Sequence, residues 1–138
     1  MNDYDQILTE TVEKFSANAG MIHKIDPSDN CLHIVAYTKG LPQSLIEATS
    51  IIPIGKGISG TTALTKKPIA IKNLSAETPG FVRPAAKTLG LGGMLSAPIF
   101  KGDEVIGTIG IATVNEREFT EEEIKDLVKI ANDLANKL

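Results

Sequence analysis

Residues 55–60 read Gly-Lys-Gly-Ile-Ser-Gly, and the meaning of this glycine run decides which fold the chain adopts. The run matches the G-x-G-x-x-G pattern, which binds dinucleotides when it joins a buried parallel strand to a helix. The segment before it does not suit a buried central strand, because Pro53 has no backbone N–H to donate. Glu77 lies at a suitable distance to bind a ribose, but its neighbours at 76–80 are typical of a loop. The sequence therefore predicts a tight turn that leads into a helix.

A second nucleotide-binding interpretation comes from Ala-Ile-Lys at residues 70–72, which imitates the strand lysine of a protein kinase. A kinase also requires an H-R-D loop, a D-F-G metal site and an A-P-E segment. Neither His23 nor His33 is followed by Arg-Asp, and 138 residues are too few for that fold. The kinase interpretation is therefore rejected.

Length and composition indicate one small domain. A chain of 138 residues with 42% hydrophobic and 22% charged residues is ordinary for a globular protein. No apolar run approaches the roughly 20 residues that span a bilayer, so we expect no transmembrane helix. The first residues are acidic and polar where a secretory signal is basic and then apolar, and we expect a cytoplasmic protein. The sequence also favours a stand-alone chain or an N-terminal domain.

Charge and cysteine content exclude further classes. A net charge of −3 provides no basic footprint, so we expect no direct nucleic-acid binding. The single cysteine, Cys31, excludes an internal disulfide and fits a reducing compartment. Residues 29–32 supply no cation that would activate the thiol, and we expect Cys31 to be an unreactive, partly buried side chain.

Hydrophobic periodicity predicts an α+β domain with an antiparallel sheet. The last helix has the clearest start, because Thr-Glu-Glu-Glu at residues 120–123 forms a capping box. Lys-Gly-Asp at 101–103 is the clearest hairpin turn. The patterns predict helices over residues 4–18, 44–48, 59–65 and 120–138, and strands over residues 21–25, 31–38, 51–54, 69–71, 93–100 and 104–113.

Five motifs in order along the chain resemble the GAF domain, a small sensory module of signalling proteins. They lie at residues 54–60, 67–69, 94–99, 102–110 and 118–123. The resemblance implies a single GAF domain over residues 1–138. It further implies a PAS-like or profilin-like sheet of five to six strands, with the N- and C-terminal helices on one face and short connector helices and loops on the other.

The resemblance also implies a ligand pocket between one face of the sheet and the connectors. In GAF relatives this pocket receives cyclic nucleotides, bilins, haem, 2-oxoacids or other metabolites, and the fold does not choose among them. We therefore leave the cofactor unknown. The residues expected to line the pocket are Ile58, Thr62, Phe81, Arg83, Met94, Ser96 and Thr108.

Within that set, Arg83 is the candidate to bind a carboxylate or phosphate, because its guanidinium offers paired donors. The alternative is a solvated loop arginine. We also expect Gly107 to leave space above the sheet where a larger side chain would protrude.

A metal site is not expected. His23 and His33 lie in two strands of a predicted hairpin, but a metal normally needs three or four ligands. The further candidates, Cys31 and Asp26, lie at strand ends or in turns. Hydrogen-bonded or exposed histidines explain both positions.

Three functions stay open from the sequence. The leading hypothesis is a non-enzymatic sensor that binds a small molecule and signals through its terminal helices, as a homodimer or to a downstream signalling protein. The second is a dimerisation or protein-interaction module without a ligand, whose pocket is filled by its own side chains Phe81, Leu89, Leu91 and Met94. The third is an enzyme like the free methionine-(R)-sulfoxide reductases, whose disulfide chemistry requires an attacking and a resolving cysteine.

Overall fold

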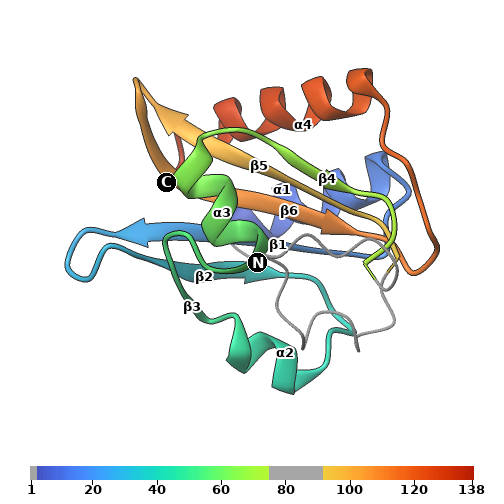
Figure 1. Cartoon of the computed structure of the whole chain (residues 1–138), viewed down its shortest axis with the longest axis horizontal. Helices are drawn as coiled ribbons and strands as arrows, with labels where there is room; N and C mark the ends of the chain where they lie inside the picture. The colour runs from blue at the N-terminus through green and yellow to red at the C-terminus, as the bar shows by residue number, and fades with distance from the viewer. Residues whose placement is uncertain (1–2, 75–91) are drawn as a thin grey trace.

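The computed structural model describes residues 3–74 and 92–138, which form a six-stranded antiparallel sheet with helices on both faces (Figure 1). The helices are α1 Asp3–Lys14, α2 Gln43–Ala48, α3 Gly57–Thr65 and α4 Glu121–Leu134. The strands are β1 Ala19–Asp26, β2 Cys31–Tyr37, β3 Ile51–Pro53, β4 Ile69–Ile71, β5 Met94–Lys101 and β6 Glu104–Ala112. The predicted α+β class and the order of the elements are therefore confirmed.

The strands are arranged in the order β3-β2-β1-β6-β5-β4. The central pair joins distant parts of the chain, since Ile22 of β1 lies opposite Ile109 of β6. The sequence predicts that Pro98 occupies an edge or a bulge. It lies within β5, which is not an edge strand, but the pairing with β4 ends at Ser96. Pro98 therefore has no neighbouring strand on its β4 side.

Helices α1 and α4 cover one face of the sheet (Figure 1). The capping box at the start of α4 is confirmed: Thr120 accepts a hydrogen bond from the N–H of Glu123, whose carboxylate accepts one in return. Each fully buried leucine contributes about 1.5–3 kcal/mol. We call the hydrophobic cluster on this face the terminal-helix core; its buried residues are Leu8, Phe15, Ile22, Ala36, Leu95, Ala97, Ile99, Ile109, Ile111, Phe119, Leu127, Ala131 and Leu134.

The glycine run forms the turn that places α3 on the opposite face. Gly57 has a φ of 63°, which favours glycine, and α3 begins there rather than at residue 59. A Cβ added to Gly60 would lie 2.5 Å from the carbonyl oxygen of Pro53. The N–H of Gly55 also donates to the carbonyl of Gly60 at 2.8 Å. The glycines therefore allow the helix and the preceding strand to approach closely.

The expectation for Gly107 is wrong. A Cβ there would lie 2.3 Å from the carbonyl oxygen of His23 on the adjacent strand. Gly107 therefore allows a close approach of two strands rather than leaving open space above the sheet.

Of the helices in the described part of the chain, none is long and apolar enough to span a membrane.

Candidate ligand-binding cavity

A cavity of about 110 Å³ lies between the sheet and the connectors, on the face away from α1 and α4. Its wall comes from β1, β3, β5 and β6, from α2 with the residues before and after it, from the start of α3, and from Leu74. Most of these side chains are apolar, and the largest are Met21, Leu41, Leu45, Ile52, Ile58, Leu74, Met94 and Ile111. Such a wall suits a ligand that buries apolar surface.

The alternation of β1 places its side chains on two faces. Met21 and His23 line the cavity, whereas Ile22 is fully buried in the terminal-helix core. On β6, Gly110 forms part of the cavity wall, and a Cβ there would lie 3.7 Å from Cε of Met94, an ordinary contact. The space at Gly110 is therefore open on the cavity side.

His23 is the most deeply buried polar group of the wall, with 1% of its surface exposed. Its Nε2 lies 2.8 Å from the carbonyl oxygen of Thr49, the residue that caps the C-terminus of α2. Since a carbonyl only accepts, Nε2 carries the proton. Burial is the main cause that lowers the pKa of His23. The hydrogen bond to Thr49 raises this pKa by less, and the nearby His33 contributes a smaller lowering. His23 is therefore a neutral side chain that ties β1 to the end of α2.

The predicted site residues lie in several places. Ile58 and Met94 line the cavity. Thr62 and Ser96 are fully buried between α3 and β5, with their hydroxyl oxygens 3.0 Å apart. The structure thus brings the first pair into the wall and places the second pair in the packing under α3.

Thr108 and the two remaining candidates differ from these four. Thr108 is 1% exposed, lies opposite His23 on the neighbouring strand, and has no hydrogen-bond partner for its hydroxyl within the described residues. It is not among the described residues of the cavity wall. Phe81 and Arg83 lie outside the described residues, so their placement in the site stays a prediction.

Sequence reasoning missed several wall residues, including Met21, Leu41, Leu45 and Leu74. The alternation of side chains along β1 could have predicted Met21, because it places Met21 on the same face of the sheet as His23. No local pattern predicts that Leu41 and Leu45 line the cavity, because this depends on where α2 lies relative to the sheet.

The two histidines do not share a site. His33 is partly exposed and pairs with Asp29 at 2.8 Å, whereas His23 is buried at the cavity. Within residues 3–74 and 92–138, no group of three or more histidine, cysteine or acidic residues is placed to hold a metal ion. Cys31 is partly exposed at the start of β2, and its Sγ lies 3.6 Å from the carbonyl oxygen of Asp29.

These features define an α+β domain with two terminal helices on one side of a sheet and a small apolar cavity on the other. The GAF domain model matches residues 4–138, and the chain belongs to the GAF domain family. GAF domains are typically sensory or regulatory, although some relatives are enzymes.

Solved structures share this fold. The GAF domain of a phosphoenolpyruvate-protein phosphotransferase from Coxiella burnetii has a TM-score of 0.79 at 23% identity, over 96% of this chain and 77% of that chain. A type II free methionine-R-sulfoxide reductase from Thermoplasma acidophilum has a TM-score of 0.80 at 16% identity, over 96% of this chain and 87% of that chain. A domain of a two-component sensor histidine kinase protein from Sinorhizobium meliloti has a TM-score of 0.75 at 18% identity, over 97% of this chain and 87% of that chain.

At these identities the likeness shows the fold alone. Among curated proteins, none matches the chain.

Proposed function

We propose that this chain is a non-enzymatic sensory domain that binds a small molecule in the cavity and signals through its terminal helices. The observation that carries the proposal is the position of the apolar cavity, on the reverse side of the strands that support α1 and α4. A ligand alters such a domain only if it binds one conformation more tightly than another. The strands that form the cavity wall also support α1 and α4, so a ligand that favours one arrangement of these strands can change the position of the helices.

Strand β5 illustrates the shared support. Met94 lines the cavity, and the next residue, Leu95, is fully buried in the terminal-helix core. Strand β1 repeats this arrangement with Met21 and Ile22. Because successive side chains of a strand point to opposite faces, a strand that moves to accept a ligand also moves the surface under the terminal helices.

The proposed site includes Ile58 and Met94 from the predicted set, together with His23. Burial of a ligand against the apolar wall contributes about 25 cal/mol per Å² of apolar surface. Arg83 remains the predicted partner for a carboxylate or phosphate on the ligand. The cytoplasmic location also remains a prediction.

A thermal-shift screen tests the proposal. Cyclic nucleotides, 2-oxoacids, haem, bilins and a wider metabolite set are added separately to the purified chain. A true ligand at 100 times its Kd adds about 2.7 kcal/mol to stability, and one chemical class raises Tm. The same class raises Tm less in Gly110→Ala, whose added methyl group reduces the cavity, than in the matched surface variant Ser44→Ala. Equal shifts in both variants place the ligand elsewhere and refute this site.

A homodimer through the terminal helices is the second part of the proposal. A groove of about 300 Å³ runs between α1 and α4 and exposes part of Ile7 and Ile130 between charged residues of both signs. A second copy of the chain covers this groove, with a downstream signalling protein as the alternative occupant. Light scattering is expected to show a dimer for the unmodified chain and a monomer for Ile130→Glu. A monomer in both cases refutes the dimer.

The reductase alternative lacks support from the residues. Disulfide chemistry needs two cysteines, and Cys31 is the only one in the chain and does not line the cavity. We therefore expect no thiol-dependent reduction of free methionine-(R)-sulfoxide. Activity that disappears in Cys31→Ser would overturn this expectation.

A further inference from the structure

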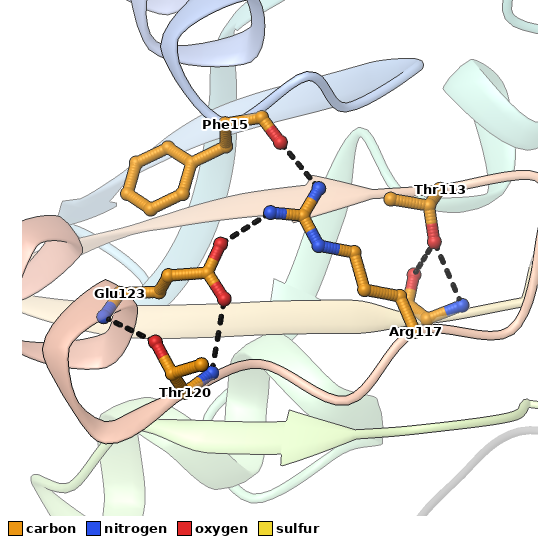
Figure 2. A network of polar contacts seen from close by, with 6 residues as sticks. Phe15, Thr113, Arg117, Thr120 and Glu123 are labelled. Atoms are coloured by element: carbon orange, nitrogen blue, oxygen red, sulfur yellow. Dashed lines mark hydrogen bonds and ion pairs between the residues drawn. The ribbon is translucent and has the colours of Figure 1, made fainter.

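Arg117 connects the two terminal helices. It lies in residues 113–117, the segment between β6 and the turn before α4, which we call the junction segment. Figure 2 shows its guanidinium donating to the carbonyl oxygen of Phe15, just after α1, and pairing with the carboxylate of Glu123 in the first turn of α4. The guanidinium carbon also lies 4.7 Å from the ring centre of Phe119. One side chain therefore holds the end of α1 and the start of α4.

The carboxylate of Glu123 binds both Arg117 and the backbone of Thr120. Its second carboxylate oxygen accepts the N–H of Thr120 in the capping box, at 3.0 Å (Figure 2). The hydrogen bond from the Thr120 backbone is the main cause that lowers the pKa of Glu123, and Arg117 adds to it. The ionised carboxylate thus joins Arg117 to the cap of α4.

The other side of the junction segment is hydrogen-bonded to residues that lie close in sequence to the cavity wall. The N–H of Arg117 donates to the carbonyl of Lys72 at 3.0 Å, two residues before Leu74 of the wall. Leu74 donates to the carbonyl of Gly92 at 2.7 Å, and Gly92 donates to Thr113 at 2.6 Å. Residues on both sides of the 75–91 stretch are therefore bonded to the junction segment or to each other.

This contact is also tightly packed. A Cβ on Gly92 would lie 2.3 Å from the carbonyl carbon of Asn115, and one on Gly93 would lie 2.9 Å from the carbonyl oxygen of Arg117. Met94, the next residue, lines the cavity. The backbone at Gly92 and Gly93 therefore meets the junction segment without intervening side chains.

We propose that the junction segment couples the cavity to the terminal helices, with Arg117 as the positioning residue that transmits the change to the ends of α1 and α4. The proposal rests on the proposed sensory function, because it assigns the route by which occupancy of that cavity reaches the helices. Contacts alone do not establish coupling, so the competing account is a static clamp. A static clamp affects stability but leaves the response to the cavity unchanged.

Amide hydrogen exchange with benzene as the probe separates these accounts. An apolar cavity of about 150 Å³ binds benzene. The cavity here measures about 110 Å³ and is open to solvent, so its wall can adjust to the ring. In the unmodified chain, benzene is expected to slow exchange at the wall and to change it about fivefold at the helix ends, the lower range of allosteric coupling. In Arg117→Gln the response at the wall persists, whereas the response at residues 15–18 and 120–124 is lost.

Two further variants complete the test. Lys129→Gln removes an exposed positive charge from α4 and is expected to behave as the unmodified chain. Arg117→Lys keeps the charge without the paired donors and is expected to recover only part of the helix-end response. A full helix-end response in Arg117→Gln overturns the coupling and leaves the cavity proposal standing.

The remaining outcomes also decide the question. If benzene changes nothing at the wall, the cavity proposal fails in this assay, and Gly110→Ala serves as the perturbation of the wall instead. Coupling then predicts altered exchange at the helix ends in Gly110→Ala but not in Gly110→Ala combined with Arg117→Gln. If Arg117→Gln does not fold, Glu123→Gln removes the ion pair from the other side, and an undiminished response there refutes the proposal.

Discussion

The two faces of the sheet differ in how they are filled. Under α1 and α4, the terminal-helix core is one continuous cluster that takes apolar side chains from both helices and four strands. On the opposite face, the buried apolar residues form two small clusters, and the polar side chains of His23, Thr62 and Ser96 are also buried there. The cavity lies on this second face. We therefore expect the first face to supply most of the stability, whereas the second face contains the cavity.

The largest expected difference is between a buried leucine of the terminal-helix core and an exposed leucine of α3. Leu127 is fully buried in the terminal-helix core, so Leu127→Ala is expected to lower the free energy of unfolding by about 2–5 kcal/mol. Leu64 on α3 is 61% exposed, and Leu64→Ala is expected to change stability by no more than about 0.5 kcal/mol. Urea denaturation measures both. A loss below about 1 kcal/mol for Leu127→Ala would contradict the assignment of stability to this face.

Two glycines sharpen the comparison within the cavity face. Gly60→Ala places a methyl group against the backbone of Pro53 and is expected to cost about 1–3 kcal/mol. Gly110→Ala places it in the cavity at ordinary contact distance, and is expected to be neutral or to stabilise by about 0.4–1 kcal/mol. Melting curves of the two variants check the order. Equal losses would mean that the space at Gly110 is filled.

The pH dependence of stability tests the cavity face through His23. Because burial lowers the pKa of His23 in the folded chain, the unfolded chain binds more protons once the pH falls below about 6.5. The contribution of neutral His23 is therefore complete above that pH and declines as the pH falls toward the folded pKa, by at most about 1.4 kcal/mol per pH unit. Urea denaturation from pH 7.5 to 5 should show this slope, and His23→Gln should flatten it. An unchanged slope in His23→Gln would assign the effect to other groups.

A smaller effect is expected at the start of α4, on the terminal-helix face. Thr120→Ala removes the capping hydroxyl and is expected to cost about 0.5–2 kcal/mol. Thr120→Ser keeps the hydroxyl and should retain most of that stability. A loss of equal size in both variants would show that the methyl group, not the cap, contributes the energy.

The sequence predicted features that depend on neighbours in the chain. Local patterns predicted the capping box at Thr120, the turn at Gly57 and the hairpin between β5 and β6, and the structure confirms all three. The glycine run was correctly interpreted because a glycine-rich turn followed by a helix needs only local geometry.

Contacts between distant residues were not predictable in this way. His23 binds Thr49, 26 residues away, and Arg117 binds Phe15, 102 residues away. The sequence shows that Gly107 lacks a side chain, but it does not show that the backbone of His23 occupies the space above it. The cavity itself depends on how α2 and α3 pack on the sheet, which no local pattern specifies.

Methyl NMR of the methionines tests the central claim, that the cavity is a ligand site, most directly. Met21 and Met94 both line the cavity from different strands, and the methyl groups of the exposed Leu64 on α3 serve as references. The proposed function predicts that a compound that raises Tm shifts the methyl signals of Met21 and Met94 together, saturably and with one Kd, while the reference methyls stay unchanged. A compound that raises Tm without shifting either methionine would contradict it.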